Sequence, residues 1–331
     1  MISHSTTLAA EVAEAFDLGV VRSAEPGGQG AAGRIWRLQT ADDEVAVKEL
    51  FWVSNATEVE PSAIREAAFV EVARAAGISA PAPRADRNGR YVSPLPSGVV
   101  RVADWVPGRT VRRDDLGAAH WIGWVYGTVI GLRLPVQGEL LNPWYTVPPT
   151  ERCWRDLVAA GRRHGLGWAG ELRRQIPTLI EMGQVAGDRA DHELAWSHTD
   201  LHPQNVLRRG SRLVLLDWED AGPVVPVFML ARMLLDWGRT GLDTIDRERI
   251  GAVLAGFRSA GGTTEPKSLA DFGGLVAGTQ NFLVAQLTLT LDPHDDDELR
   301  VVSTRQARHL LENPLSAELL QQVLDTVHHQ S

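Results

Sequence analysis

The sequence predicts an α+β fold of two lobes: a small N-terminal lobe with an antiparallel sheet and a helix, and a larger, mostly helical C-terminal lobe. The chain has 331 residues, which is more than one simple hydrophobic core usually holds. Segments with strand-like alternation fill the first third of the chain, whereas helical periodicity dominates the remainder. Two breaker residues, Pro107 and Gly108, separate these regions. We therefore expect an N-lobe over 1–103, a hinge over 104–108 and a C-lobe over 109–331.

The expected N-lobe opens with a short helix over 8–16 and a glycine-rich turn over 26–30. Two alternating segments, 34–39 and 44–50, have the length of strands, and the short turn between them predicts a hairpin. The second of these strands carries Lys48 in its middle.

A helix is expected over 57–76, because apolar residues such as Ile64, Ala68 and Val72 recur there at helical spacing. Gly77 and the prolines that follow it are typical of a helix end. The segment 91–104 then has the pattern of two further strands.

Helices are predicted for most of the C-lobe, and one tight hairpin interrupts them. The hairpin joins 206–208 to 213–216 through a turn that contains Gly210. The helices are expected at 115–132, 151–162, 168–183 and 226–237, with several more after 246.

Composition and charge narrow the class of function. The net charge of -9 argues against a nucleic-acid binder, which usually presents a basic face, and it suits a cationic partner. Cys153 is the single cysteine, so no disulfide can form within the chain, as is usual in a reducing compartment. The first residues lack the pattern of a signal peptide, and no apolar run of about 18 residues is present to cross a membrane. We expect a cytoplasmic protein with no membrane contact.

The segment 198–205, with the sequence HTDLHPQN, carries the residues that indicate a chemistry. Asp200 follows His198 by two positions, Asn205 follows Asp200 by five, and Asp217 follows Asn205 by twelve. This is the spacing of a kinase catalytic loop followed by a metal-binding aspartate. Phosphoryl transfer needs a carboxylate that orients the acceptor hydroxyl and takes its proton, and it needs hard oxygen ligands for Mg²⁺. The loop, the hairpin and the aspartate at its exit would supply these groups at one end of a small sheet.

Lys48 is notable for both composition and position. The chain has two lysines, Lys48 and Lys267, against 31 arginines. An ammonium is a compact point charge and a guanidinium is a planar fork, so a lysine kept in this background is a candidate for a role that arginine cannot fill. A glycine-rich hairpin precedes Lys48, and Glu66 follows it on the expected helix. This order predicts a lysine that binds phosphate and is held by Glu66.

With these motifs, the chain resembles the aminoglycoside phosphotransferase family, within the wider group of choline-kinase-like and protein-kinase-like enzymes. The resemblance covers nearly the whole chain, from the glycine-rich hairpin through the hinge to the segment LVLLDWEDAGP around Asp217. It implies a two-lobed protein-kinase-like fold. It also implies ATP, with GTP possible, and Mg²⁺ as cofactors, and a hydroxyl group on a small molecule as the acceptor.

The resemblance also implies residue roles. By position, Asp200 looks like the catalytic base, or the residue that orients the hydroxyl. Asn205 and Asp217 look like the Mg²⁺ ligands. Lys48 looks like the phosphate-binding lysine, paired with Glu66.

For the nucleotide, the resemblance implies that the glycine-rich segment around Gly28 contacts phosphate and that the hinge backbone at Asp104 and Val106 receives adenine. Two departures from the family pattern stand out. The loop 27–33 is not a clean G-x-G-x-x-G, so the amides that would touch phosphate are not fixed. Met229 occupies a position at which the family often has an acid that braces the catalytic loop.

Several side chains near these motifs keep two interpretations. Glu219 and Asp220 suit either a substrate amine or the cap of the next turn. His198 fits a packed, structural imidazole, whereas the role of His202 is open. The loop 144–145, with its Trp-Tyr pair, either faces the acceptor or packs into the core.

The leading functional hypothesis is an ATP-dependent phosphotransferase acting on a small, possibly cationic alcohol such as an aminoglycoside or related antibiotic. A kinase of a metabolite alcohol, choline-like or a sugar, is the alternative within the class. A nucleotide-binding pseudokinase is the alternative outside it, and Met229 is its one support. A protein kinase is disfavoured because Trp218 and Glu219, rather than Phe-Gly, follow Asp217. The sequence makes no prediction of the oligomeric state.

Overall fold

The computed structural model divides the chain into two compact units. The first comprises Met1–Val111 and Gln204–Ala221, and the second comprises Arg112–Pro203 and Gly222–Ser331. The residues that the structure describes are 4–29, 33–51, 53, 55–136, 142–186, 193–291 and 297–330.

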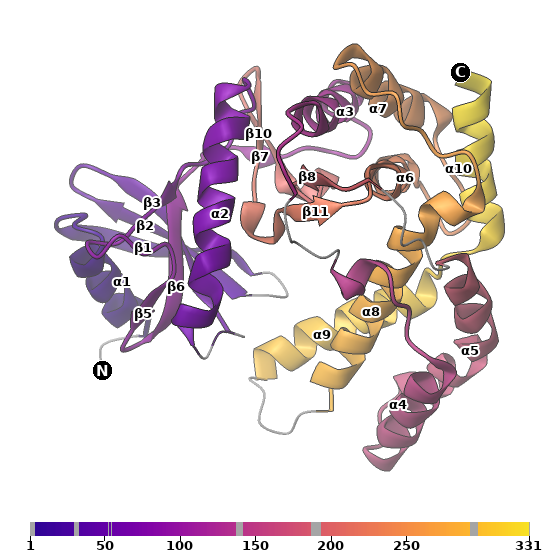
Figure 1. The fold of residues 1–331 in the computed structure, drawn as a ribbon. Helices are drawn as coiled ribbons and strands as arrows, with labels where there is room; N and C mark the ends of the chain where they lie inside the picture. The colour runs from indigo at the N-terminus through magenta and orange to yellow at the C-terminus, as the bar shows by residue number, and fades with distance from the viewer. Residues whose placement is uncertain are drawn as a thin grey trace. The chain divides into compact units, whose positions relative to one another are not determined.

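Antiparallel strands and two helices build the first unit (Figure 1). Its main sheet has the strand order β1-β2-β3-β6-β4, and β5 pairs with β6. A second, three-stranded sheet has the order β10-β9-β7. The elements are α1 (His4–Ala15), β1 (Val21–Gln29), β2 (Gly33–Thr40), β3 (Glu44–Leu50), α2 (Ala56–Ala75), β4 (Pro83–Arg84), β5 (Ser93–Leu95), β6 (Gly98–Asp104), β7 (Arg109–Thr110), β9 (Val206–Arg209), β10 (Arg212–Leu215) and the short 3-10 helix η3 (Trp218–Asp220).

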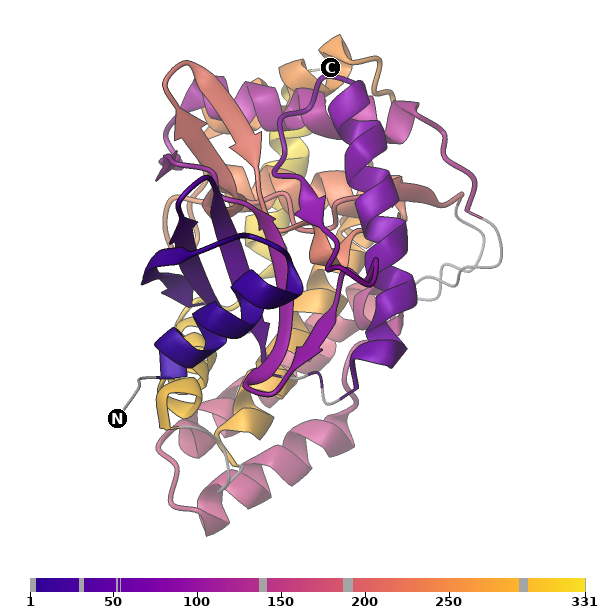
Figure 2. The ribbon, with the colours of Figure 1, turned by 90° about the vertical axis from the view of Figure 1, so that its left-hand side faces the viewer.

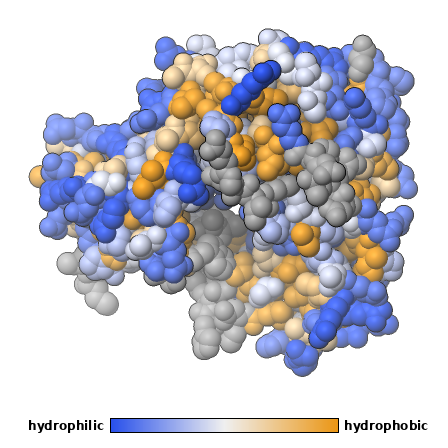
Figure 3. Space-filling model, in the orientation of Figure 1, coloured by the Kyte–Doolittle hydropathy of each residue, from blue (hydrophilic) through white to orange (hydrophobic). Residues whose placement is uncertain are grey.

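The two helices of the first unit lie on opposite faces of the main sheet (Figures 1 and 2). Val12 on α1 packs in one hydrophobic cluster with Val45 and Val47 of β3. Since successive side chains of a strand point to opposite faces, Lys48 lies on the other face, on the side of α2. Leu50, on the same face as Lys48, packs against α2 in a separate cluster. Most of the surface of this unit seen in Figure 3 is hydrophilic.

The predicted helix over 57–76 is confirmed as α2, but its buried face differs from the apolar pattern. Asn55 caps its start, because the side-chain oxygen accepts a hydrogen bond from the N–H of Thr57 at 3.1 Å. Ile64 and Val72 are 50% and 37% exposed. Glu66 and Phe69 are buried instead. The sheet that the helix packs on, rather than the apolar repeat alone, sets the buried face.

The glycine-rich turn expected over 26–30 is wrong for the described part of that segment. Pro26 and Gly28 belong to β1, opposite Trp36 and Ile35 of β2, with a register shift between the two pairs. A side chain at Gly27 would begin 3.1 Å from the ring of Trp105, which leaves little room for one at this position. Residues 30–32 lie outside the described residues.

The hairpin predicted around Gly210 is confirmed as β9 and β10, and it groups with the first unit. β9 pairs with β7, the strand that follows the hinge. The N–H of Leu215 also donates to the carbonyl oxygen of Ser79, just after α2, at 2.9 Å. These bonds explain why Gln204–Ala221 clusters with the first unit. The units therefore divide the chain differently from the expected boundaries at 1–103, 104–108 and 109–331.

The second unit is mostly helical, and its predicted helices at 115–132, 151–162, 168–183 and 226–237 are confirmed with small shifts at their ends. In the described part of the chain, no helix is both long enough and apolar enough to cross a membrane. The elements are α3 (Leu116–Gly131), the 3-10 helix η1 (Pro143–Tyr145), α4 (Glu151–Arg163), α5 (Trp168–Val185), β8 (Ala195–Ser197), β11 (Gly222–Val224), α6 (Pro226–Gly238), α7 (Arg247–Ser259), η4 (Leu269–Phe272), α8 (Gly273–Leu289), α9 (Asp297–Glu312) and α10 (Ala317–Gln330).

The core of the second unit includes a close contact between α3 and α7. Glycine makes it possible, since a side chain at Gly256 would begin 1.8 Å from the carbonyl oxygen of His120. Next to this contact, the rings of Tyr126 and Phe257 stack with centroids 5.6 Å apart. The hydroxyl of Tyr126 donates to the carbonyl oxygen of Pro226 at 2.6 Å, which ties α3 to the start of α6.

Candidate active site

Lys48 lies between two carboxylates that follow β10. Its Nζ donates to Oδ1 of Asp217 at 3.0 Å and also bonds to Oε1 of Glu219. Burial by itself lowers the pKa of Lys48, but the charges of Glu219 and Asp217 outweigh it and raise the pKa above its ordinary value. The ammonium is therefore charged throughout the neutral range. If Glu219 binds a substrate amine, one of its two interpretations, that amine has to compete with Lys48 for the carboxylate.

Glu66 does not pair with Lys48 as predicted. It bonds instead to Nη2 of Arg101 on β6, and Nη1 of Arg101 lies 3.9 Å from Oε2 of Glu219. Arg101 is the cross-strand neighbour of Lys48, so two cations stand side by side on the face of the sheet that points to α2. Burial raises the pKa of Glu66 to about 7, although the charge of Arg101 opposes this rise. A role for Glu66 in nucleotide binding stays a prediction.

Asn205 and Asp217 are brought together within the first unit. The N–H of Leu216 donates to the carbonyl oxygen of Asn205 at 2.8 Å, which places Asp217 next to that residue. Asp217 has a left-handed backbone with φ 61° and ψ 59°, a conformation that costs a non-glycine residue roughly 1–2 kcal/mol. Trp218, the residue after Asp217, also anchors this turn, because its Nε1–H donates to the carbonyl oxygen of Leu215 at 2.9 Å.

The side chains of Asn205 and Asp217 fit Mg²⁺ as hard oxygen donors. Mg²⁺ commonly takes one or two protein oxygens and completes its shell with water and substrate phosphates. The described residues contain no cluster of three or more His, Cys, Asp or Glu side chains that could hold a metal by themselves.

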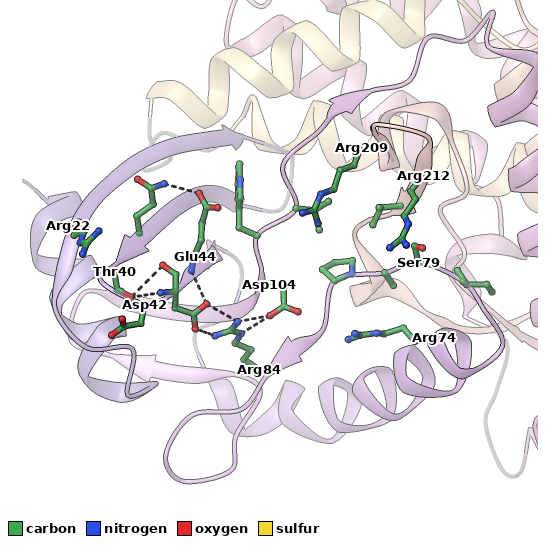
Figure 4. A pocket seen from close by; sticks show the side chains of 18 of the residues that line it. Arg22, Thr40, Asp42, Glu44, Arg74, Ser79, Arg84, Asp104, Arg209 and Arg212 are labelled. Carbon is green, nitrogen blue, oxygen red and sulfur yellow. Dashed lines mark hydrogen bonds and ion pairs between the residues drawn. The ribbon is translucent and has the colours of Figure 1, made fainter.

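The hinge residues Asp104 and Val106 line an open cavity of about 890 Å³ that is formed within the first unit (Figure 4). The carboxylate of Asp104 is held by Arg84 at 2.9 and 2.7 Å, and the N–H of Asp104 donates to the carbonyl oxygen of Ala82. The N–H of Trp105 donates to the carbonyl oxygen of Glu44 at 3.1 Å. The backbone N–H of Val106 has no such partner among the described residues and is a hinge donor that adenine could use.

Asp200 belongs to the second unit, in the loop after β8. Nη2 of Arg232, on α6, donates to Oδ1 of Asp200 at 2.7 Å, and Nε2 of His202 lies 3.1 Å from Oδ2. Burial by itself raises the pKa of Asp200, but the hydrogen bond from His202 and the charge of Arg232 lower it well below its usual range. The carboxylate is thus ionised at neutral pH, the form that can accept a proton. Burial by itself lowers the pKa of His202, but the hydrogen bond to Asp200 and the charge of that carboxylate outweigh burial and raise the pKa.

Arg232 also supports the loop that contains Asp200. Its Nη1 donates to the carbonyl oxygen of Thr199 at 3.2 Å, and its Nε lies 3.4 Å from Asp236. Thr199 has a positive φ of 64°, so this residue, like Asp217, is held in the left-handed region. Met229, at the position where an acid was expected, is 5% exposed and contributes apolar surface. The bracing function falls to the arginine one turn further along α6.

His198 and the Trp-Tyr pair of the loop 144–145 all lie in the second unit. His198 is completely buried, as expected of a packed imidazole, and its Nδ1 accepts a hydrogen bond from the N–H of Asp200 at 3.3 Å. Tyr145 lines a small cavity of about 30 Å³ together with Met229 and Arg232. Trp144 is 36% exposed and is not among the residues that line it.

Comparison with known proteins assigns the chain to a family. The sequence profile of the phosphotransferase enzyme family (APH) matches residues 23–267. The chain belongs to this family. No protein with a curated description matches the phosphotransferase by sequence.

Solved structures show the kinase-like fold of this phosphotransferase. A spectinomycin phosphotransferase solved with ADP and spectinomycin has a TM-score of 0.65 at 13% identity, covering 98% of both chains. An aminoglycoside phosphotransferase from Alicyclobacillus acidocaldarius has a TM-score of 0.61 at 15% identity, covering 100% of this chain and 96% of the other. A choline kinase from Streptococcus pneumoniae has a TM-score of 0.57 at 16% identity, covering 94% and 100%. By family and fold, the chain is a small-molecule kinase.

Sequence reasoning missed two residues of this phosphotransferase, Arg101 and Arg232. Arg101 was visible as a charged residue between the buried valines at positions 100 and 102 of a strand, where the alternation places it on the face of Lys48. Arg232 was visible as one of two charged residues, with Asp236, in a mostly apolar helix. A charge in such a place usually has a partner, although the sequence does not name it.

Proposed function

We propose that this phosphotransferase transfers the γ-phosphate of ATP to a hydroxyl group of a small molecule. The contact of 3.0 Å between Nζ of Lys48 and Oδ1 of Asp217 carries the proposal. It joins a cation suited to nucleotide phosphates and a carboxylate suited to Mg²⁺. In the sequence, this carboxylate follows Asp200 as the metal-binding aspartate follows a kinase catalytic loop. ADP in the structure of the spectinomycin enzyme supports an adenine nucleotide. We assume a cytoplasmic location, as the single cysteine suggests.

Each residue then has one task. Asp200 orients the acceptor hydroxyl and takes its proton, because its ionised carboxylate is available at neutral pH. Lys48 releases its carboxylate partners and holds phosphate oxygens. Asn205 and Asp217 hold Mg²⁺, which neutralises charge on the triphosphate when it is bound. The N–H of Val106 receives adenine.

An antibiotic with a free hydroxyl, such as an aminocyclitol or aminoglycoside, is the acceptor that we favour. The spectinomycin and aminoglycoside phosphotransferases, which cover nearly the whole chain, support this choice. The structure of a choline kinase at similar likeness supports a second candidate, a metabolite alcohol. Arg232 balances the charge of Asp200, so recognition of a cationic acceptor has to come from other carboxylates.

A phosphate-transfer screen tests the proposal. Purified protein is incubated with Mg²⁺ and either ATP or GTP. Aminoglycosides, spectinomycin, choline, ethanolamine and sugars serve as acceptors, and the phosphorylated acceptor is detected by mass spectrometry. We expect turnover on one acceptor class and a loss of about 100-fold or more in Asp200→Asn, which keeps the shape of the side chain. Nucleotide binding without transfer to any acceptor would favour the pseudokinase alternative, and equal turnover in Asp200→Asn would remove Asp200 as the base.

A further inference from the structure

The cavity beside the hinge has an arginine-rich end that the proposed reaction does not use. Figure 4 shows Arg74, Arg209 and Arg212 at this end, around Ser79. We call these four residues the basic end. Lys48, Asn205 and Asp217 are not among the residues that line the cavity.

The three guanidinium groups of the basic end have no carboxylate partner in the described part of the chain. All three side chains are exposed. At the other end of the same cavity, Arg84 is held by Asp43 and Asp104. The positive charges of the three arginines at the basic end repel one another, and an anion bound among them would offset this repulsion.

The fold holds the basic end together. Arg74 lies in the last turn of α2, while Arg209 and Arg212 form the facing pair at the turn between β9 and β10. The bond of 2.9 Å from the N–H of Leu215 to the carbonyl oxygen of Ser79 fixes the hairpin against the loop after α2. The cations therefore approach the cavity from two elements that are tied to each other.

The shape and charge of the cavity define the class of ligand. A planar guanidinium matches the geometry of phosphate with two parallel hydrogen bonds, and three of them call for more than one phosphate group. A cavity of about 890 Å³ lies in the range of small-molecule sites rather than of a surface for a macromolecule. We propose that the basic end binds a small polyanion with two or more linked phosphate groups, at a site separate from the catalytic residues.

Calorimetric titration with tripolyphosphate, without Mg²⁺ and at physiological salt, tests this site. The Lys48→Ala protein serves as the background, because it weakens phosphate binding at the catalytic residues. We expect binding in that background, and about tenfold weaker binding after Arg209→Gln or Arg212→Gln is added. Arg163→Gln, which removes an exposed arginine of α4, is the matched control and should leave the affinity unchanged.

Three results would overturn the proposal. Binding that disappears in Lys48→Ala would place the polyanion at the catalytic residues. An equal loss in Arg163→Gln would indicate attraction to net charge alone. No measurable binding in the unaltered protein would remove the site altogether. Circular dichroism checks that each variant folds; the substituted arginines are exposed, whereas Lys48 is partly buried.

Discussion

Arg232 donates a hydrogen bond of 2.7 Å to Oδ1 of Asp200 and another of 3.2 Å to the carbonyl oxygen of Thr199. One side chain thus fixes both the carboxylate and the backbone of the loop that carries it. In the family pattern an acid at the position of Met229 often has this bracing task. Here an arginine has this task, and its positive charge lies next to the carboxylate of the proposed catalytic residue, Asp200.

Replacement of Arg232 by Met should lower kcat about 10–100-fold, since Asp200 loses its orientation. Arg232 helps to hold the pKa of Asp200 below its usual range, so the pKa should rise when Arg232 is removed. The base has to be ionised, and the acid limb of the pH–rate profile should therefore move to higher pH. Profiles of kcat from pH 4 upward provide the measurement.

Two further variants separate these effects. Arg232→Lys keeps the charge and should leave the acid limb near its original position while kcat falls. Arg247→Gln removes an exposed arginine of α7 and should change neither quantity. If Arg232→Met lowers only the melting temperature and leaves the pH profile unchanged, the arginine is structural and does not position the base.

Lys48→Met should reduce kcat/KM for ATP by about 100-fold or more, because the phosphates lose their cation. Lys48→Arg should restore little of it, since a planar fork cannot replace a point charge between Asp217 and Glu219. The other lysine of the chain gives a matched control: Lys267→Met, at an exposed position, should retain full activity. Near-normal kinetics in Lys48→Met would contradict the assigned role.

Glu66 should make the stability of the protein depend on pH. Burial raises its pKa to about 7 in the folded protein, against 4.5 as the ordinary value, so between these pH values the folded state holds a proton that the unfolded state has released. The free energy of unfolding should therefore fall as pH rises through this window, by about 3 kcal/mol. Glu66→Gln should lack this fall.

Denaturant unfolding at pH 4.5 and pH 8 measures the difference between the variants. Glu71→Gln changes an exposed glutamate of the same helix and should behave like the unaltered protein. The charged neighbours of Glu66 act in both directions: Arg101 opposes the rise of the pKa, whereas Glu219 and Asp220 add to it. A parallel pH dependence in Glu66→Gln would show that another group is responsible.

Asp217→Asn should raise the Mg²⁺ concentration needed for half-maximal activity by about tenfold or more, because a charged oxygen ligand is lost. Titration of Mg²⁺ at saturating ATP measures the shift. Asp42→Asn, at an exposed turn between β2 and β3, is the control for the lost charge. An unchanged Mg²⁺ requirement in Asp217→Asn would rule out Asp217 as a metal ligand.

The sequence by itself determined the features that depend on local order. The spacing from Asp200 to Asn205 and Asp217 identified phosphoryl transfer. Alternation and turn residues located the hairpins, and helical periodicity located the helices to within a few residues. These properties follow from contacts along a few turns or strands, so a single sequence contains the necessary information.

Only the tertiary structure decided which charges meet. Lys48 and Arg101 are neighbours because β3 and β6 pair in one register. In this arrangement Glu66 forms its ion pair with Arg101. Lys48 forms its ion pairs with Asp217 and Glu219. These partners are separated by up to 171 positions in the chain. A pairing over such a distance depends on the packing of whole elements, and local spacing does not encode it.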